Sequence, residues 1–99
     1  MSINENFLRW YDTYLDLRSY IDRLRDLDKK ERERIIDEIY HLITSYDENL
    51  IDEHVLSFPM SQRRRWYDKD PYSWMVINGL KYADERLLDK IVDRLRQKL

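Results

Sequence analysis

The chain has no cysteine, one glycine and two prolines among its 99 residues. Without cysteine it has no disulfide framework, no thiolate nucleophile and no cysteine-ligated metal site. A single glycine cannot form the glycine-rich loops that hold phosphates, and so little glycine and proline is unsuited to the many turns of a β-sandwich. The longest uninterrupted apolar run, Trp74–Ile77, is far too short to cross a bilayer.

The composition is typical of one folded helical domain. Hydrophobic residues make up 42% of the chain, charged residues 38% and aromatic residues 13%, which excludes both a membrane protein and a disordered one. A chain of this length forms a single domain and buries roughly 60–65% of the surface that its unfolded form exposes. Its core is therefore small, and association with a second chain is one way to enlarge it.

Charge is balanced over the whole chain but not along it. The formal net charge of −2 gives no general attraction to nucleic acid or to anionic lipid. Residues 37–53 contain six acidic residues and no Lys or Arg, and Arg63, Arg64 and Arg65 follow shortly afterwards. Met1–Phe7 lacks the basic region and apolar run of a signal peptide. With no cysteine and no membrane span, we expect a cytoplasmic protein.

Two long amphipathic helices are predicted in the first half of the chain. The first spans about Ile3–Leu27, opens with the Ser2/Glu5 capping box and carries the apolar stripe Phe7, Trp10, Tyr14, Leu17, Ile21 and Leu24. The second spans about Lys30–Tyr46, with Asp28 as its N-cap. Because the connection between them is short, the two helices should form a long antiparallel αα-hairpin.

Shorter helices are predicted in the rest of the chain. Phe58-Pro59-Met60 is the clearest break, since the residue before a proline is pushed toward extended geometry. Asp70 and Pro71 form a cap and first-residue pair, and Asp84 caps the last helix. The predicted helices are residues 48–57, 62–68, 72–82 and 85–98.

One local pattern favours a different structure. Trp74–Ile77 followed by Asn78-Gly79 and Leu80 is typical of a β-hairpin with an Asn-Gly turn. The second strand would be very short, and an isolated hairpin is marginal on its own, so helix is favoured. In a helix, Gly79 is either a costly interior residue, about 1 kcal/mol worse than Ala, or a point where another helix packs closely.

Together these segments predict an all-α fold: a small bundle of four to six helices with a long N-terminal αα-hairpin. We expect one domain over residues 1–99. In it, residues 1–57 form the hairpin and its extension, residues 58–71 a connecting segment, and residues 72–99 a C-terminal helix pair.

The connecting segment contains the most conspicuous cluster of side chains, Arg63-Arg64-Arg65-Trp66-Tyr67. A structural role is favoured, in which Trp66 and Tyr67 anchor the segment in the core. The arginines would then pair with the acidic stretch over residues 37–53 or stack on aromatic rings. The same cluster is a candidate for binding a partner protein. With Lys69, its arginines could also hold the phosphates of a nucleic acid, although the net charge of −2 argues against this.

The stretch from Arg64 to Pro71, Arg-Arg-Trp-Tyr-Asp-Lys-Asp-Pro, resembles a motif of small uncharacterised bacterial helical proteins, and the resemblance extends to about Leu95. In such proteins the Asp-Pro pair opens a helix, and an acidic cap, here Asp84, opens the next. The resemblance therefore implies helix rather than hairpin over residues 72–82. It implies no activity and carries over no catalytic residue.

Glu38 and His41 form a Glu-x-x-His pair, whose side chains share one helix face. Di-iron carboxylate bundles need two such pairs and two further Glu residues, whereas Glu53 and His54 are adjacent and have the wrong spacing. A metal-binding helical bundle is therefore the least favoured alternative. Neither histidine has partners at the spacing of a catalytic triad. We expect no catalytic residue, no metal and no cofactor.

The first predicted helix carries more apolar surface than one neighbouring helix can cover. Trp10 and Tyr14 on that helix are residue types that protein interfaces favour, although at helical spacing such residues are more often core. We therefore expect a homodimer that acts as a small non-enzymatic interaction, regulatory or adaptor protein, which also contacts another protein. The alternative function is association with nucleic acid through Arg63–Arg65.

Overall fold

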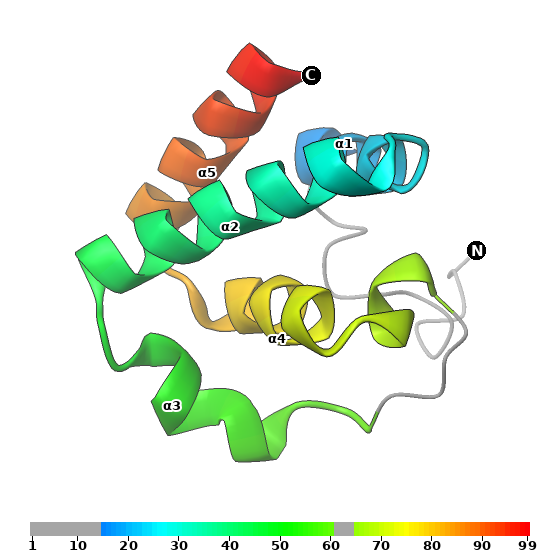
Figure 1. Cartoon of the computed structure of the whole chain (residues 1–99). Coiled ribbons are helices and arrows are strands. Elements are labelled where there is room, and N and C mark those ends of the chain that lie inside the picture. The colour runs from blue at the N-terminus through cyan, green and yellow to red at the C-terminus, as the bar shows by residue number, and fades with distance from the viewer. Residues whose placement is uncertain (1–14, 61–64) are drawn as a thin grey trace, which may run out of the picture.

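The computed structural model describes residues 15–60 and 65–99, in which the chain forms five α-helices, three short 3-10 helices and no strand (Figure 1). The α-helices are α1 (Leu15–Arg25), α2 (Lys29–Tyr46), α3 (Leu50–His54), α4 (Pro71–Gly79) and α5 (Glu85–Lys98). The 3-10 helices are η3 (Val55–Ser57), η4 (Trp66–Lys69) and η5 (Leu80–Tyr82). The predicted all-α fold is confirmed. Over these residues, no helix is long and apolar enough to cross a membrane.

Aspartate side chains cap three of the helices at the positions that the sequence predicts. At the start of α2, the Asp28 carboxylate accepts a hydrogen bond from a first-turn backbone N–H at 3.0 Å. Asp70 does the same for α4 at 3.1 Å, and Asp84 for α5 at 2.9 Å. Each cap satisfies an amide that the helix itself leaves without a partner. These caps explain why the three helices begin within about one residue of the predicted starts.

The core is organised around α5, which packs against both α1 and α2. The turn between α1 and α2 is as short as predicted, but α1 is seen nearly along its axis in Figure 1 whereas α2 runs across the view. Residues 3–14 of the predicted first helix lie outside the described residues. The buried apolar side chains of these three helices are Leu17, Ile21, Leu24, Ile35, Ile36, Ile39, Ile43, Leu87, Leu88, Ile91 and Leu95.

α4 packs against both α2 and α3 and places its own apolar residues in the same core. At its end Gly79 is buried. A Cβ atom at that position would lie 3.1 Å from Cγ1 of Ile51 on α3, which is closer than an ordinary van der Waals contact. Of the two roles expected for this glycine, the structure shows the close approach of another helix.

The alternative β-hairpin over residues 74–80 is wrong. A hairpin turn of the Asn-Gly type needs positive φ at both central residues, whereas Gly79 has φ −62° and ψ −30°, which is helical. The side-chain amide of Asn78 also donates to the backbone carbonyl of Trp74, one helical turn earlier, at 2.8 Å. Both residues of the supposed turn are therefore part of α4.

Two tyrosine hydroxyls connect α2 with later parts of the chain. Tyr72 of α4 donates a hydrogen bond to the Asp37 carboxylate at 2.9 Å, and Tyr46 donates to the Asp84 carboxylate at 2.7 Å. Burial, together with the bond to Asp37, raises the pKa of the Tyr72 hydroxyl. The bond from Tyr46 is the main reason that the pKa of Asp84 is lowered.

Candidate interaction surface

The residues that the sequence marks for partner binding are only partly described. Tyr67 lies in the core with 1% of its surface exposed. Its hydroxyl accepts a hydrogen bond from the Arg65 guanidinium at 2.8 Å, and its ring centre lies 5.6 Å from the same group. Trp66 is half-buried against the core. These contacts hold η4 in place. The remaining candidates lie outside the described residues: Trp10, Tyr14, Arg63 and Arg64.

Within the acidic stretch, Glu38 of α2 is paired with cations of α5. Oε1 of Glu38 lies 3.2 Å from the Arg94 guanidinium and 3.6 Å from the Lys98 ammonium. Glu38 is also the carboxylate of the predicted Glu-x-x-His pair. Its partner in that pair, His41, instead donates through Nδ1 to the backbone carbonyl of Asp37 at 2.8 Å. The two side chains therefore serve separate contacts. The structure, as far as it is described, has no group of three or more His, Asp or Glu residues placed to hold a metal ion.

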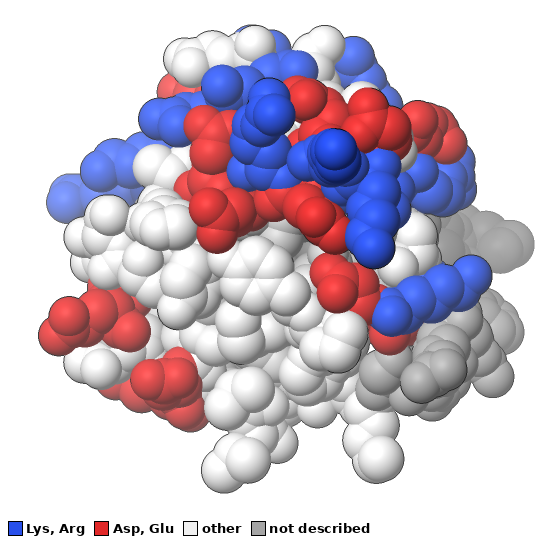
Figure 2. All heavy atoms as spheres, viewed as in Figure 1, with Lys and Arg blue, Asp and Glu red and all other residues white. Residues whose placement is uncertain are grey.

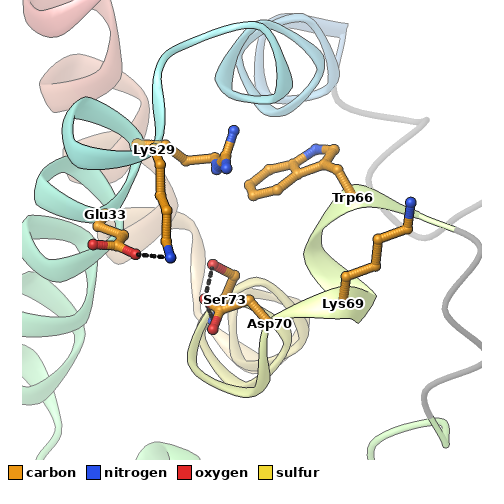
Figure 3. A pocket seen from close by; sticks show the side chains of 7 residues that line it. Lys29, Glu33, Trp66, Lys69, Asp70 and Ser73 are labelled. Atoms are coloured by element: carbon orange, nitrogen blue, oxygen red, sulfur yellow. Dashed lines mark hydrogen bonds and ion pairs between the residues drawn. The ribbon is translucent and has the colours of Figure 1, made fainter.

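A hollow of about 360 Å³ lies between α2, η4 and α4 (Figure 3). Its charged groups are largely engaged with one another or with the backbone. The Lys29 ammonium lies 3.9 Å from Glu33, and Arg32 donates to backbone carbonyls at the end of α1. Lys69 points away from Lys29 in Figure 3, so the cations do not converge on one point. The lining residues are Lys29, Arg32, Glu33, Trp66, Lys69, Asp70 and Ser73.

Charge is unevenly distributed over the face shown in Figure 2. Basic and acidic side chains alternate over α2 and α5 in the upper half of that view, whereas the lower half, around α3 and α4, is nearly uncharged apart from acidic groups at its edge. The sequence accounts for this contrast, since residues 35–60 contain no Lys or Arg and residues 71–80 contain no charged residue at all. The molecule therefore has a largely uncharged side.

On this side, residues 55–60 are fixed by aromatic contacts. Phe58 is buried, with 7% of its surface exposed, and its ring lies 5.5 Å from Trp74 and 5.9 Å from Tyr82, centre to centre. The Trp74 indole N–H donates to the carbonyl of Pro59 at 3.1 Å. Phe58 has φ −68° and ψ 143°, which confirms the extended geometry predicted before Pro59.

Two large apolar side chains project from this fixed segment. Leu56 is 98% exposed and Met60 is 87% exposed. They are four residues apart in the chain, so their Cα atoms are separated by at most about 14 Å. Burying a side chain of this kind contributes about 1.5–3 kcal/mol, which the isolated chain does not gain. Isolated exposed apolar residues are common on proteins; here two occur within five consecutive residues of a firmly held backbone.

Carboxylates lie beside Leu56. Asp52 and Glu53 precede it by four and three residues in the helical stretch formed by α3 and η3, and residues at those spacings share one face. With Glu48, which precedes α3, they are exposed and have no hydrogen bond or ion pair among the residues that the structure describes. We use "the Leu56 surface" for Leu56 and Met60 together with these three carboxylates.

The exposure of Leu56 was not predicted from the sequence, which indicates only a helix over residues 48–57. At about 100° per residue, Leu56 lies about 120–140° around the helix from Leu50 and Ile51, which are buried. It lies only about 40–60° from Asp52 and Glu53, which are exposed. The helix tightens into a 3-10 turn at Val55, which changes these directions by only about 20° per residue. The two carboxylates three and four residues earlier are therefore the signal that could have indicated the exposure of Leu56.

A comparison of the chain with protein-family models, curated proteins and solved structures found no match. The similarity of residues 64–95 to small bacterial helical proteins therefore stays a prediction. The chain is shown to be a small all-α domain, and its function is inferred from its own surface chemistry.

Proposed function

We propose that the chain is a small protein-interaction domain, without catalytic activity of its own, that binds another protein through the Leu56 surface. The exposure of Leu56 and Met60 carries this proposal. Interfaces gain most of their free energy from a few large side chains that become fully desolvated on binding. A segment already fixed by Phe58 and Trp74 loses little conformational entropy when a partner covers it.

The proposal is tested with the double variant Leu56→Gln and Met60→Gln. Both side chains are exposed, so the variant should fold as the wild type does. The two proteins are immobilised and exposed to a lysate of the cell that encodes the chain. Proteins retained only by the wild type are then purified and their binding is measured directly. We expect the double variant to bind them at least about tenfold more weakly.

A matched control distinguishes the Leu56 surface from the rest of the molecule. Ser19→Gln together with Lys30→Gln places two glutamines at exposed positions on α1 and α2, and this control should bind as the wild type does. If the Leu56→Gln/Met60→Gln variant retains the same partners with the same affinity, the assignment of this surface is wrong.

Nucleic-acid binding is the competing function. It is favoured by the exposed Lys29 and Lys69 and by Arg32, whose guanidinium lies 5.6 Å from the centre of the Trp66 ring. The acidic Glu33 and Asp70, however, line the same hollow. A labelled oligonucleotide serves as a second probe in the same binding assay. Affinity that falls steeply between about 50 and 200 mM salt, and that Lys29→Ala with Lys69→Ala abolishes, would favour this function over the proposed one.

A further inference from the structure

Given the proposed function, we infer that the partner of the Leu56 surface presents a basic segment carrying large apolar side chains. The inference rests on charge complementarity. Glu48, Asp52 and Glu53 are exposed carboxylates with no partner among the described residues, and residues 35–60 hold no Lys or Arg that could neutralise them. Lysines or arginines beside an apolar anchor would meet these carboxylates while the anchor covers Leu56.

The same carboxylates argue against a second copy of this surface as the occupant. In a twofold-symmetric dimer each subunit contributes the same patch, and residue i of one chain contacts residue j of the other while j contacts i. The Leu56 surface contains three carboxylates and no Lys or Arg, so neither copy offers a cation to the carboxylates of the other. Like charges brought together in an interface are unfavourable and serve to reject a partner. A basic segment avoids this repulsion.

An anionic membrane is disfavoured for the same reason. Leu56 and Met60 are side chains that could enter a lipid interface. Binding to anionic lipid, however, is driven by Lys and Arg next to the apolar residues. Here the residues next to Leu56 are Asp52 and Glu53, which anionic headgroups repel.

The probe is a short synthetic peptide of leucine and lysine, with the leucines at helical spacing. A peptide in which glutamate replaces every lysine has the same apolar pattern and the opposite charge. Binding of each labelled peptide to the full chain is followed by fluorescence anisotropy at about 50 and 200 mM salt. We expect the lysine peptide to bind, more weakly at the higher salt, and the glutamate peptide to bind at least about tenfold more weakly.

Two protein variants divide the apolar contribution from the charge contribution. Leu56→Gln with Met60→Gln should weaken the lysine peptide about tenfold or more. Glu48→Gln with Asp52→Asn and Glu53→Gln should also weaken it about tenfold and remove most of the salt dependence. The control variant Glu33→Gln, Glu85→Gln and Asp89→Asn makes the same change in net charge at exposed positions on α2 and α5. It should leave the affinity within about threefold of the wild type.

The outcomes separate the two proposals. If the glutamate peptide binds as well as the lysine peptide, or the triple carboxylate variant binds as the wild type does, the basic partner is wrong, although a loss with Leu56→Gln/Met60→Gln still supports the proposed function. If Leu56→Gln/Met60→Gln has no effect on a peptide that binds, both proposals fail at this surface. Phosphatidylserine vesicles that bind the wild type but not this double variant would replace the basic segment with a membrane.

Discussion

At the residue scale, Gly79 shows how one position can decide the distance between two elements. Its backbone has ordinary helical dihedral angles, so no conformational requirement calls for glycine. What calls for it is the neighbour: Ile51 Cγ1 would lie 3.1 Å, and Phe58 Cζ 3.8 Å, from an added Cβ atom. Phe58 in turn anchors the segment that presents Leu56. The absence of a side chain at Gly79 therefore lets α3 and η3 lie directly on α4.

Substitutions at Gly79 should separate helix propensity from packing. Gly79→Ala gains about 1 kcal/mol of helix propensity but crowds Ile51, so we expect the free energy of unfolding to change by less than about 1 kcal/mol. Gly79→Val adds two methyl groups to a filled site and should cost about 1–3 kcal/mol. Urea unfolding of both variants measures this difference.

The same two substitutions at Ser45 provide the control. Ser45 is an exposed residue of α2, and there Ala and Val should differ by only about 0.5 kcal/mol, since only helix propensity separates them. A Gly79→Val variant as stable as the wild type would show that α3 does not lie as close to α4 as the Ile51 distance implies.

At the element scale, the start of α5 is coupled to the end of α2. Asp84 caps α5 through the Leu87 backbone N–H and accepts the Tyr46 hydroxyl at 2.7 Å. Both contacts favour the ionised carboxylate and lower its pKa, with the Tyr46 bond as the larger cause. A carboxyl with a lowered pKa in the folded state stabilises the fold above its unfolded pKa of about 3.9. That stabilisation is lost as the pH falls through the folded pKa.

We therefore predict that Tyr46→Phe moves the pKa of Asp84 upward, toward its ordinary value. The variant should lose more stability at pH 7 than near pH 2, because protonated Asp84 no longer accepts the bond as a charged group. A carboxyl-detected NMR titration measures the pKa, and urea unfolding at the two pH values measures the stability. Tyr72→Phe is the control, since its hydroxyl bonds to Asp37. An Asp84 pKa that is the same in Tyr46→Phe and the wild type would contradict this account.

The helices differ in how far the sequence determines them. α5 begins and ends where predicted, at Glu85 and Lys98, because an aspartate cap and an unbroken apolar period are both local signals. α3 ends earlier than predicted, at His54, because its conversion to a 3-10 turn depends on Phe58 packing against Trp74 and Tyr82, which are distant in the sequence. The acidic residues of the Leu56 surface, and the position of Leu56 on their side of the helix, can be predicted from the sequence. The anchoring of the segment by Phe58 against Trp74 and Tyr82 cannot.

At the scale of the whole molecule, the described residues separate two kinds of surface. α2 and α5 carry interleaved charges, which in part pair with one another through Glu38, Arg94 and Lys98. The other surface includes α4, which has no charged residue, and the Leu56 surface with its exposed Leu56 and Met60 and its three carboxylates. Mixed charges favour solubility, whereas the uncharged side has the composition of an interface core with an acidic rim. Binding at the Leu56 surface would therefore leave the charged side facing solvent.

The predicted homodimer must then use a different part of the chain. The sequence places Trp10 and Tyr14 on an apolar stripe that one neighbouring helix cannot cover, whereas the Leu56 surface would repel a copy of itself. Sedimentation equilibrium at micromolar concentration should give twice the chain mass of 12.4 kDa for the wild type and for Leu56→Gln/Met60→Gln. Trp10→Glu with Tyr14→Glu should give a single chain mass, with circular dichroism confirming that this variant remains helical. If the wild type sediments as one 12.4 kDa chain, the prediction of a homodimer is wrong. If the dimer dissociates only in Leu56→Gln/Met60→Gln, the chain self-associates through the Leu56 surface instead.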